Sequence, residues 1–216
     1  EAGFDKEALG LLPVAVEQWG PMIMVHPDPG ARSFRETNPI LMQAAEEAGF
    51  KPDMSRYTPV KEIEYEIETN WKLWYDNGTE CYHCPNIHGA SFGDAFNVAP
   101  EDTTIRLEEN FSSYTFKGNP NPKANGLSAE NYISFQVFPG LVVVLHDDIL
   151  HMTAMTPLAP GKTRHSTFYF GEEDADPARV EGWVKIWHDT YCEDNVATGI
   201  QYENLRRSGQ PYNRYV

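Results

Sequence analysis

The sequence has no run of about 18 or more apolar residues and no signal-peptide pattern at its start. It therefore predicts no membrane span. Basic side chains are also scarce: 17 Lys and Arg stand against 32 Asp and Glu, a formal net charge of -15. Because nucleic-acid binding needs a basic surface, we expect no nucleic-acid partner. Repeats and low-complexity segments are absent, and 216 residues are enough for one substantial core.

Cysteine is rare, with three residues in the chain: Cys81, Cys84 and Cys192. Three thiols cannot all pair within one chain, and Cys81 and Cys84 are too close in sequence to suggest a structural cross-link. We therefore predict reduced thiols and a cytoplasmic protein. The Cys81-x-x-Cys84 spacing is typical of half a zinc site, but no second Cys-x-x-Cys pair follows. A thiol-based site remains an alternative.

The first third of the chain predicts short elements. Two strands, 11–16 and 22–26, are expected around a Gly-Pro turn. A short helix over 40–50 should end at Gly49. A half-buried strand is then expected from Val60 onward, because polar and apolar residues alternate there.

The remainder predicts a helix, a sheet and a second helix. Trp71, Trp74 and Tyr75 are spaced for one face of a helix. A long helix should start at Asp176-Pro177 and stop at Ser208-Gly209. We therefore predict an α+β fold in a single domain over residues 1–216, with helices on one side of a curved antiparallel sheet. Its strands are expected in the runs 103–109, 112–118, 131–139, 141–147, 150–160 and 163–171.

The segment ECYHCPNIH, residues 80–88, concentrates potential metal ligands. His83 and His88 lie five residues apart, and on a regular helix this step turns about 140° away. Pro85 lies between them and should interrupt the helix, so that the chain folds back. The two imidazoles can then converge on one metal, with Glu80 beside them.

A third ligand is expected on the C-terminal helix. Asp194 lies on one stripe with Trp183, Trp187, Tyr191 and Thr198. A carboxylate on a buried face is costly unless a metal or a charge compensates it. Two histidines and one carboxylate are typical of non-haem Fe(II) oxygenases, but a zinc hydrolase can use a similar set. The spacing leaves both open.

Other residues of this helix fall off the stripe. His188 and Asp189 lie on other faces, where we expect them to be solvated. Glu193, the neighbour of Asp194, is the rival carboxylate, but it lies about 100° from the stripe.

The segment NWKLWYDNGTECYHCPNIH, residues 70–88, resembles the iron-binding segment of Rieske non-haem iron ring-hydroxylating oxygenase α subunits. The late CEDN segment and the strand run 135–170 resemble the same catalytic domain, whose fold is helix-grip, or START-like. The resemblance implies His83, His88 and Asp194 as metal ligands. It implies Asn77 near the iron, and Glu80 as an acid that bridges to the [2Fe–2S] cluster of a neighbouring subunit. Cys81 and Cys84 then become packing residues.

The resemblance also implies cofactors and partners. Fe(II) activates O2 to hydroxylate, dihydroxylate or oxidatively dealkylate a small aromatic or quaternary ammonium substrate. Electrons come from NAD(P)H through a reductase or ferredoxin and a [2Fe–2S] cluster. The E-C-Y-H-C-P form resembles the carnitine, choline and betaine oxygenase branch.

One departure from the family is large. No Rieske cluster motif occurs in this chain. We therefore expect the catalytic domain alone, inactive without the cluster domain, and a trimer in the complete protein. A zinc hydrolase using the same ligands and a non-catalytic ligand-binding module remain the alternatives.

Overall fold

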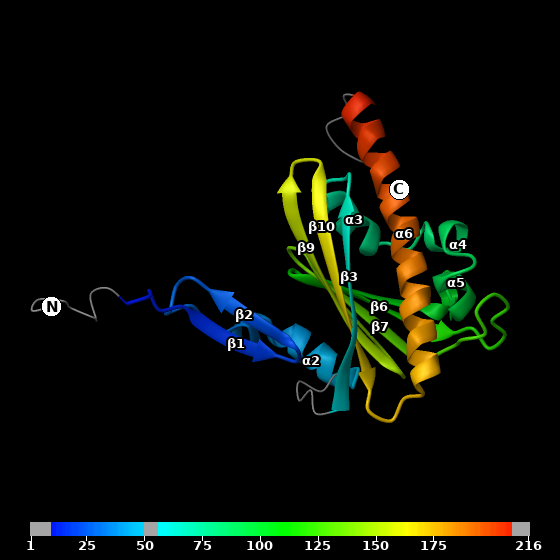
Figure 1. The fold of residues 1–216 in the computed structure, drawn as a ribbon, viewed down its shortest axis with the longest axis horizontal. Helices are drawn as coiled ribbons and strands as arrows, with labels where there is room; N and C mark the ends of the chain where they lie inside the picture. The colour runs from blue at the N-terminus through cyan, green and yellow to red at the C-terminus, as the bar shows by residue number, and fades with distance from the viewer. Residues whose placement is uncertain (1–9, 50–55, 209–216) are drawn as a thin grey trace, which may run out of the picture. The chain divides into compact units, whose positions relative to one another are not determined.

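The structure is a computed structural model that describes residues 10–49 and 56–208. It divides into two compact units, 1–55 and 56–216 (Figure 1). The prediction of one domain over residues 1–216 stays a prediction. Gly209, the expected helix stop, and Phe50 lie outside the described residues. None of the described helices is long and apolar enough to cross a membrane.

The first unit is a hairpin followed by two helices. Its elements are β1 (Ala15–Trp19), β2 (Met22–His26), α1 (Phe34–Thr37) and α2 (Pro39–Glu47). The expected first strand, 11–16, was placed too early, because Trp19 pairs with Met22 across a two-residue turn whose Gly20 has a φ of 58°. Sequence reasoning also missed α1, which begins with a capping box between Ser33 and Glu36. The second helix ends as expected, since Gly49 takes a φ of 81°.

The second unit is built on one antiparallel sheet. Its order is β3-β10-β9-β8-β7-β6-β4, and β5 pairs with β6. The strands are β3 (Tyr57–Ile67), β4 (Phe96–Asn97), β5 (Thr103–Leu107), β6 (Phe111–Gly118), β7 (Asn131–Val137), β8 (Leu141–His146), β9 (Ile149–Ala159) and β10 (Lys162–Glu172).

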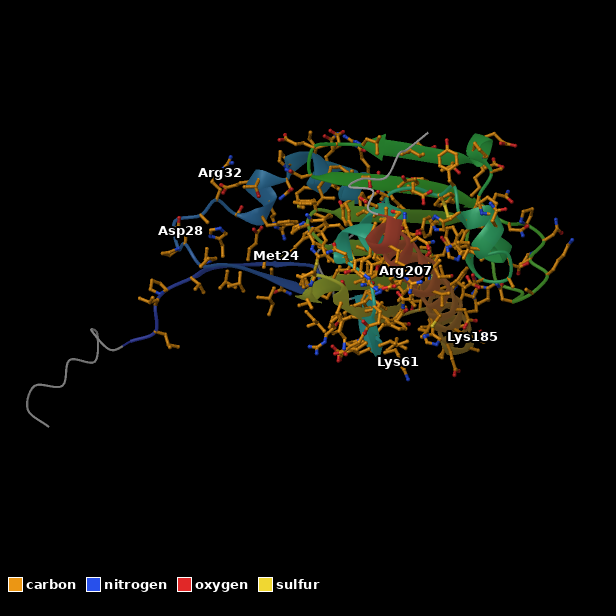
Figure 2. All side chains as sticks on the ribbon, turned by 90° about the horizontal axis from the view of Figure 1, so that it is seen from above. Met24, Asp28, Arg32, Lys61, Lys185 and Arg207 are labelled. Atoms are coloured by element: carbon orange, nitrogen blue, oxygen red, sulfur yellow. A yellow bond between two sulfur atoms is a disulfide. The ribbon has the colours of Figure 1, made fainter. Side chains whose placement is uncertain are left out.

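Helices cover this sheet, and the α+β prediction is confirmed. The longest, α6, contacts α3, α5, β3 and β10 and runs across the sheet (Figure 1). The outer face of α6 carries Lys185 and Arg207, whose side chains are 74% and 75% exposed (Figure 2). The helices are α3 (Trp71–Gly78), α4 (Cys84–Ile87), α5 (Phe92–Ala95), the 3-10 helix η2 (Pro100–Asp102) and α6 (Pro177–Ser208).

The inner face of α6 supplies the core and fixes the helix on the sheet. Trp183 is fully buried, and its Nε1 donates a hydrogen bond of 2.8 Å to Asp148, in the turn between β8 and β9. Arg179 pairs with the same carboxylate at 2.8 Å. Eleven residues make just over three full turns of an α-helix, so Asp194 lies on the same face as Trp183. The anchored helix therefore carries Asp194 to the end of the sheet where α3 and α4 lie.

Three histidines are buried beneath α6. His146, His151 and His165 are at most 5% exposed, and the Nδ1 atom of each has no hydrogen-bond partner among the described residues. Trp187 Nε1 donates to His146 Nε2 over 3.1 Å, so this nitrogen must be unprotonated. Burial lowers the pKa of His146 to about 3. The imidazole is therefore neutral in the folded protein.

Replacing His146 with Gln should weaken the pH dependence of folding stability. In the unfolded chain a histidine takes up a proton near pH ~6.5, whereas His146 in the folded protein stays neutral at that pH. The stability that depends on a neutral His146 is thus present above that pH and is lost as the pH falls toward 3. Between pH 7 and pH 5.5 the wild type should lose about 1 kcal/mol more of its unfolding free energy than His146→Gln. Urea unfolding at both pH values measures this, and identical losses would contradict it.

Candidate metal centre

Helix α3 supplies the first residue of the site. Asn70 caps this helix by accepting a hydrogen bond from the backbone N–H of Lys72. Trp74 points toward α6, where its Nε1 donates to Asn195 over 3.0 Å. These contacts fix the last turn of α3, which carries Asn77. Beyond it, the Thr79 carbonyl accepts a hydrogen bond from the Tyr114 hydroxyl of β6.

His83 and His88 lie at the two ends of the four-residue helix α4. Their rings are 5.1 Å apart between centroids and nearly perpendicular, at 79°. Pro85 does not interrupt a helix as the sequence suggested. Helix α3 already ends at Gly78, and Pro85 lies in the first turn of α4, where its missing N–H costs nothing. The predicted convergence of the two imidazoles is nevertheless present.

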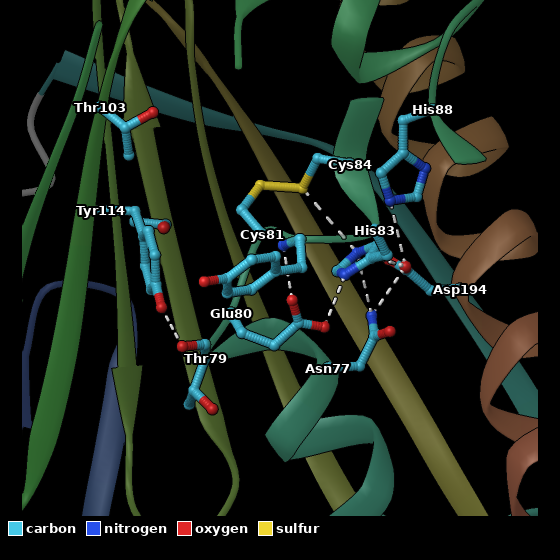
Figure 3. Close-up of a disulfide and its surroundings, with 12 residues drawn as sticks. Asn77, Thr79, Glu80, Cys81, His83, Cys84, His88, Thr103, Tyr114 and Asp194 are labelled. Carbon is cyan, nitrogen blue, oxygen red and sulfur yellow. Dashed lines mark hydrogen bonds and ion pairs between the residues drawn. A yellow bond between two sulfur atoms is a disulfide. The ribbon is translucent and has the colours of Figure 1, made fainter. Parts of the chain in front are cut away.

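Asp194 meets both imidazoles. Its Oδ1 lies 3.4 Å from His83 Nε2 and 3.1 Å from His88 Nε2. Asn77 Nδ2 donates to the same oxygen over 2.8 Å (Figure 3). Asp194 is 6% exposed and His88 is 2% exposed, so the cluster lies inside the protein. Four of the predicted residues therefore come together from α3, α4 and α6.

A glutamate holds the far side of each imidazole. Glu80 Oε1 lies 2.8 Å from His83 Nδ1, and Glu193 Oε2 lies 2.7 Å from His88 Nδ1. Ser91 Oγ donates to Glu193 over 2.6 Å. With Nδ1 donating to a carboxylate, each Nε2 faces Asp194, and its lone pair becomes available when a metal replaces the Nε2 proton. Such carboxylate–histidine pairs commonly fix the tautomer of metal ligands.

The electrostatics follow from this arrangement. Burial alone would raise the pKa of Asp194, but hydrogen bonds from His83 and His88 outweigh it and lower the value to about 2. Burial opposes a charge on His83 as well, yet Asp194 and Glu80 raise its pKa to about 9. A buried anion thus needs a cation beside it. A divalent metal can take the place of the two protons, and these donors suit one.

The two cysteines differ from the prediction. Cys81 and Cys84 form a disulfide, so the prediction that both are reduced thiols is wrong for this structure. The turn before α4 places their Cα atoms 5.1 Å apart, which is within reach of a disulfide despite the short sequence separation. Cys192 is the free cysteine.

His188 also differs from the prediction of a solvated side chain. It is partly buried, because its Nδ1 lies 2.7 Å from the Tyr65 hydroxyl of β3 and the two rings stack. Sequence reasoning considered Glu193 only as a rival ligand and missed its contact with His88. The signal available was its position next to Asp194. Ser91 carried no signal that we could identify.

A cavity opens beside the cluster. It has a volume of about 80 Å³. His83, His88, Asp194, Asn77 and Glu80 all line it, together with both cysteines. Among the described residues, no Lys or Arg lies in its wall. The remaining walls are largely aromatic: Trp74, Phe92, Tyr114, Phe116, Tyr132, Trp187 and Tyr191.

Known proteins share this fold and sequence pattern. Choline monooxygenase of Atriplex hortensis is 26% identical over 227 residues, covering 100% of this chain and 49% of that protein. The alpha subunit of 2-aminobenzenesulfonate 2,3-dioxygenase of Alcaligenes sp is 20% identical over 232 residues, covering 98% and 58%. The solved structure of the quaternary ammonium Rieske monooxygenase CntA with inhibitor MMV12 superposes with a TM-score of 0.81 at 16% identity, covering 97% and 56%. The match to this solved structure shows that the two proteins share a fold.

The family comparison covers most of the chain. Residues 54–213 match the family model described as ring hydroxylating alpha subunit (catalytic domain). The chain spans about half the length of the choline monooxygenases that it matches, 49% and 50%. It therefore belongs to the ring-hydroxylating α-subunit family and carries that family's catalytic domain in residues 54–213.

Proposed function

We propose that this chain is the catalytic domain of a mononuclear non-haem Fe(II) oxygenase that oxidises a small organic substrate. The convergence of His83 Nε2, His88 Nε2 and Asp194 Oδ1 carries the proposal. Two imidazoles and one carboxylate can hold Fe(II) while leaving coordination positions open. When bound, Fe(II) supplies the capacity to bind and reduce O2.

The surrounding residues keep the donors in place. Asn77 donates to Asp194 and so limits the rotation of the carboxylate. Glu80 and Glu193 hold the two Nδ1 atoms, which keeps each Nε2 free to bind. Thr198 and Thr190 donate to backbone carbonyls of α6, so neither hydroxyl competes for the site. The aromatic walls exclude water from the substrate.

A zinc hydrolase could use the same three donors, and a binding module could use the same cavity. Membership of a family whose relatives are named as monooxygenases and dioxygenases favours oxidation. Hydroxylation of a C–H bond consumes O2, two electrons and two protons and releases water. The electrons would come from a [2Fe–2S] cluster, a reductase and NAD(P)H, in an assembly of subunits that we expect to be a trimer.

The cavity favours a cationic substrate. Its wall offers aromatic faces and the acidic groups of Glu80 and Asp194, but no Lys or Arg from residues 10–49 or 56–208. Ring faces attract quaternary ammonium groups, by about 0.5–2 kcal/mol each. An anionic substrate would therefore find no Lys or Arg partner in the described part of this wall. We therefore propose a quaternary ammonium substrate without an acidic group, similar in chemistry to choline.

Glu193→Gln tests how the metal is held. The amide cannot accept the Nδ1–H of His88 as strongly, so Fe(II) affinity should fall about 10- to 100-fold. Asp194→Ala should abolish tight binding. The exposed Glu181→Gln, on the same helix, is the matched control and should bind normally. Anaerobic titration against a competing chelator measures all three. Unchanged Fe(II) affinity in Asp194→Ala would show that Asp194 is not a metal ligand and would contradict the proposal.

Glu80→Gln tests the passage of electrons. This variant should still hold iron when Fe(II) is in excess, because the amide oxygen of the glutamine still accepts the Nδ1–H of His83, although less strongly than the carboxylate does. In the complete enzyme, supplied with its cluster and reductase, substrate turnover should fall by about two orders of magnitude or more. Rapid-mixing measurement of cluster reoxidation separates this loss from poor substrate binding. Normal reoxidation would exclude a role for Glu80 in electron transfer.

Ligand binding tests the substrate class. Choline should bind more tightly than its uncharged isostere with a tert-butyl group, by about 3-fold to 30-fold, since only the cation gains from the ring faces. Carnitine and benzoate should bind more weakly than choline. Tyr132→Leu should reduce the preference for the cation, whereas Tyr132→Phe keeps the ring and should preserve it. Calorimetry gives the ratios, and equal affinities for choline and its isostere would exclude a cation site.

A further inference from the structure

The Cys81–Cys84 disulfide lies directly against the candidate iron ligands. Cys84 is the first residue of α4, immediately after His83, and is 5% exposed. Its Sγ lies 3.8 Å from His83 Nε2, the nitrogen that faces Asp194 (Figure 3). The sulfur is therefore close enough to the shared site to affect what binds there.

The same sulfur completes a second set of donors. The ligand atoms of His83, Cys84 and His88 all lie within 4.8 Å of one another. In the oxidised protein the Sγ of Cys84 is bonded to Cys81 and supplies no thiolate. The described chain thus holds two overlapping donor sets. One has two nitrogens and the carboxylate oxygen of Asp194, and the other has the same two nitrogens and a masked sulfur.

We propose that His83, Cys84 and His88 form a zinc site that becomes available when the Cys81–Cys84 disulfide is reduced. The inference shares two histidines with the proposed iron site and goes beyond it. A dithiol supplies two electrons and two protons: the S–S bond breaks, Cys81 and Cys84 become thiols, and the dithiol closes into its own disulfide. On metal binding, the Cys84 thiol releases its proton to solvent.

The donor chemistry gives the two sets different preferences. Thiolate is a soft ligand that favours Zn²⁺, and zinc sites commonly combine Cys with His. Zn²⁺ also binds such sites more tightly than Fe²⁺ in the usual order of divalent metals. While the sulfur is bound in the disulfide, only the nitrogen and oxygen donors can bind a metal. These donors favour Zn²⁺ over Fe²⁺ by less than a set that includes thiolate. The disulfide would then protect the site from zinc, and reduction would favour an inactive zinc-bound form.

The bond is open to reduction. Cys81 is only partly buried, and both cysteines line the cavity beside the metal centre. A small dithiol can attack Cys81 from this cavity without disturbing the core behind Cys84. Cys81 has no place in the proposed zinc set, so its role would be to mask Cys84.

Cobalt binding tests the inference without reliance on turnover. Co²⁺ reports a bound thiolate by an intense near-ultraviolet charge-transfer band. Four samples are compared anaerobically after removal of reductant: oxidised wild type, dithiol-reduced wild type, Cys81→Ser and Cys84→Ser. The band is expected in the reduced wild type and in Cys81→Ser, where Cys84 is free. It should be absent from the oxidised wild type and from Cys84→Ser, which retains Cys192 and so controls for other thiols.

Metal competition gives a second measurement. Reduction of the wild type should raise the preference for Zn²⁺ over Fe²⁺ by about tenfold or more, and Cys84→Ser should show no such rise. If reduced wild type binds cobalt without showing the charge-transfer band, the proposed zinc site is wrong. The proposed iron site is not contradicted by that result. Failure of the oxidised protein to bind cobalt overturns the proposed function instead, because that sample offers only His83, His88 and Asp194. If Cys81→Ser does not fold by circular dichroism, the reduced wild type still decides the question.

Discussion

Asp194 is a carboxylate held at 6% exposure in the aromatic face of α6, and such a charge requires compensation. The two imidazoles of α4 provide it, with Nε2 atoms 3.4 and 3.1 Å from Oδ1. In this state the carboxylate is ionised and His83 is charged, because each favours the charged form of the other. A divalent cation can satisfy all three groups together. This is the basis on which we propose a metal site.

The fold holds the side chains of this site in fixed positions. Trp183 and Arg179 attach α6 to Asp148 in the turn between β8 and β9, and Trp74 attaches α3 to Asn195 of α6. Each imidazole is held from behind by a glutamate, one from the loop after α3 and one from α6. The donors are thus oriented by regular elements and charged hydrogen bonds. The Cys81–Cys84 disulfide adds a constraint of another kind, since it determines whether sulfur can join the donors.

The sequence predicted those features that depend on local spacing. The strand alternation, the α6 stripe that carries Asp194, and the histidines around Pro85 are all visible within a few residues. Contacts between distant segments were missed. Glu193 binds His88 across 105 positions, and Tyr65 partly buries His188 across 123. The disulfide was missed because its formation depends on the turn before α4 rather than on spacing. The role of Pro85 was wrong because α3 had already ended at Gly78.

The most direct test of the central claim is anaerobic loading of this chain with Fe(II), followed by nitric oxide and electron paramagnetic resonance. A site of two histidines and one carboxylate leaves room for nitric oxide on the iron. The account predicts a high-spin iron–nitrosyl signal at about one iron per chain, which is lost in Asp194→Ala. The absence of such a signal from wild-type protein, with zinc retained or with no metal bound, would contradict it.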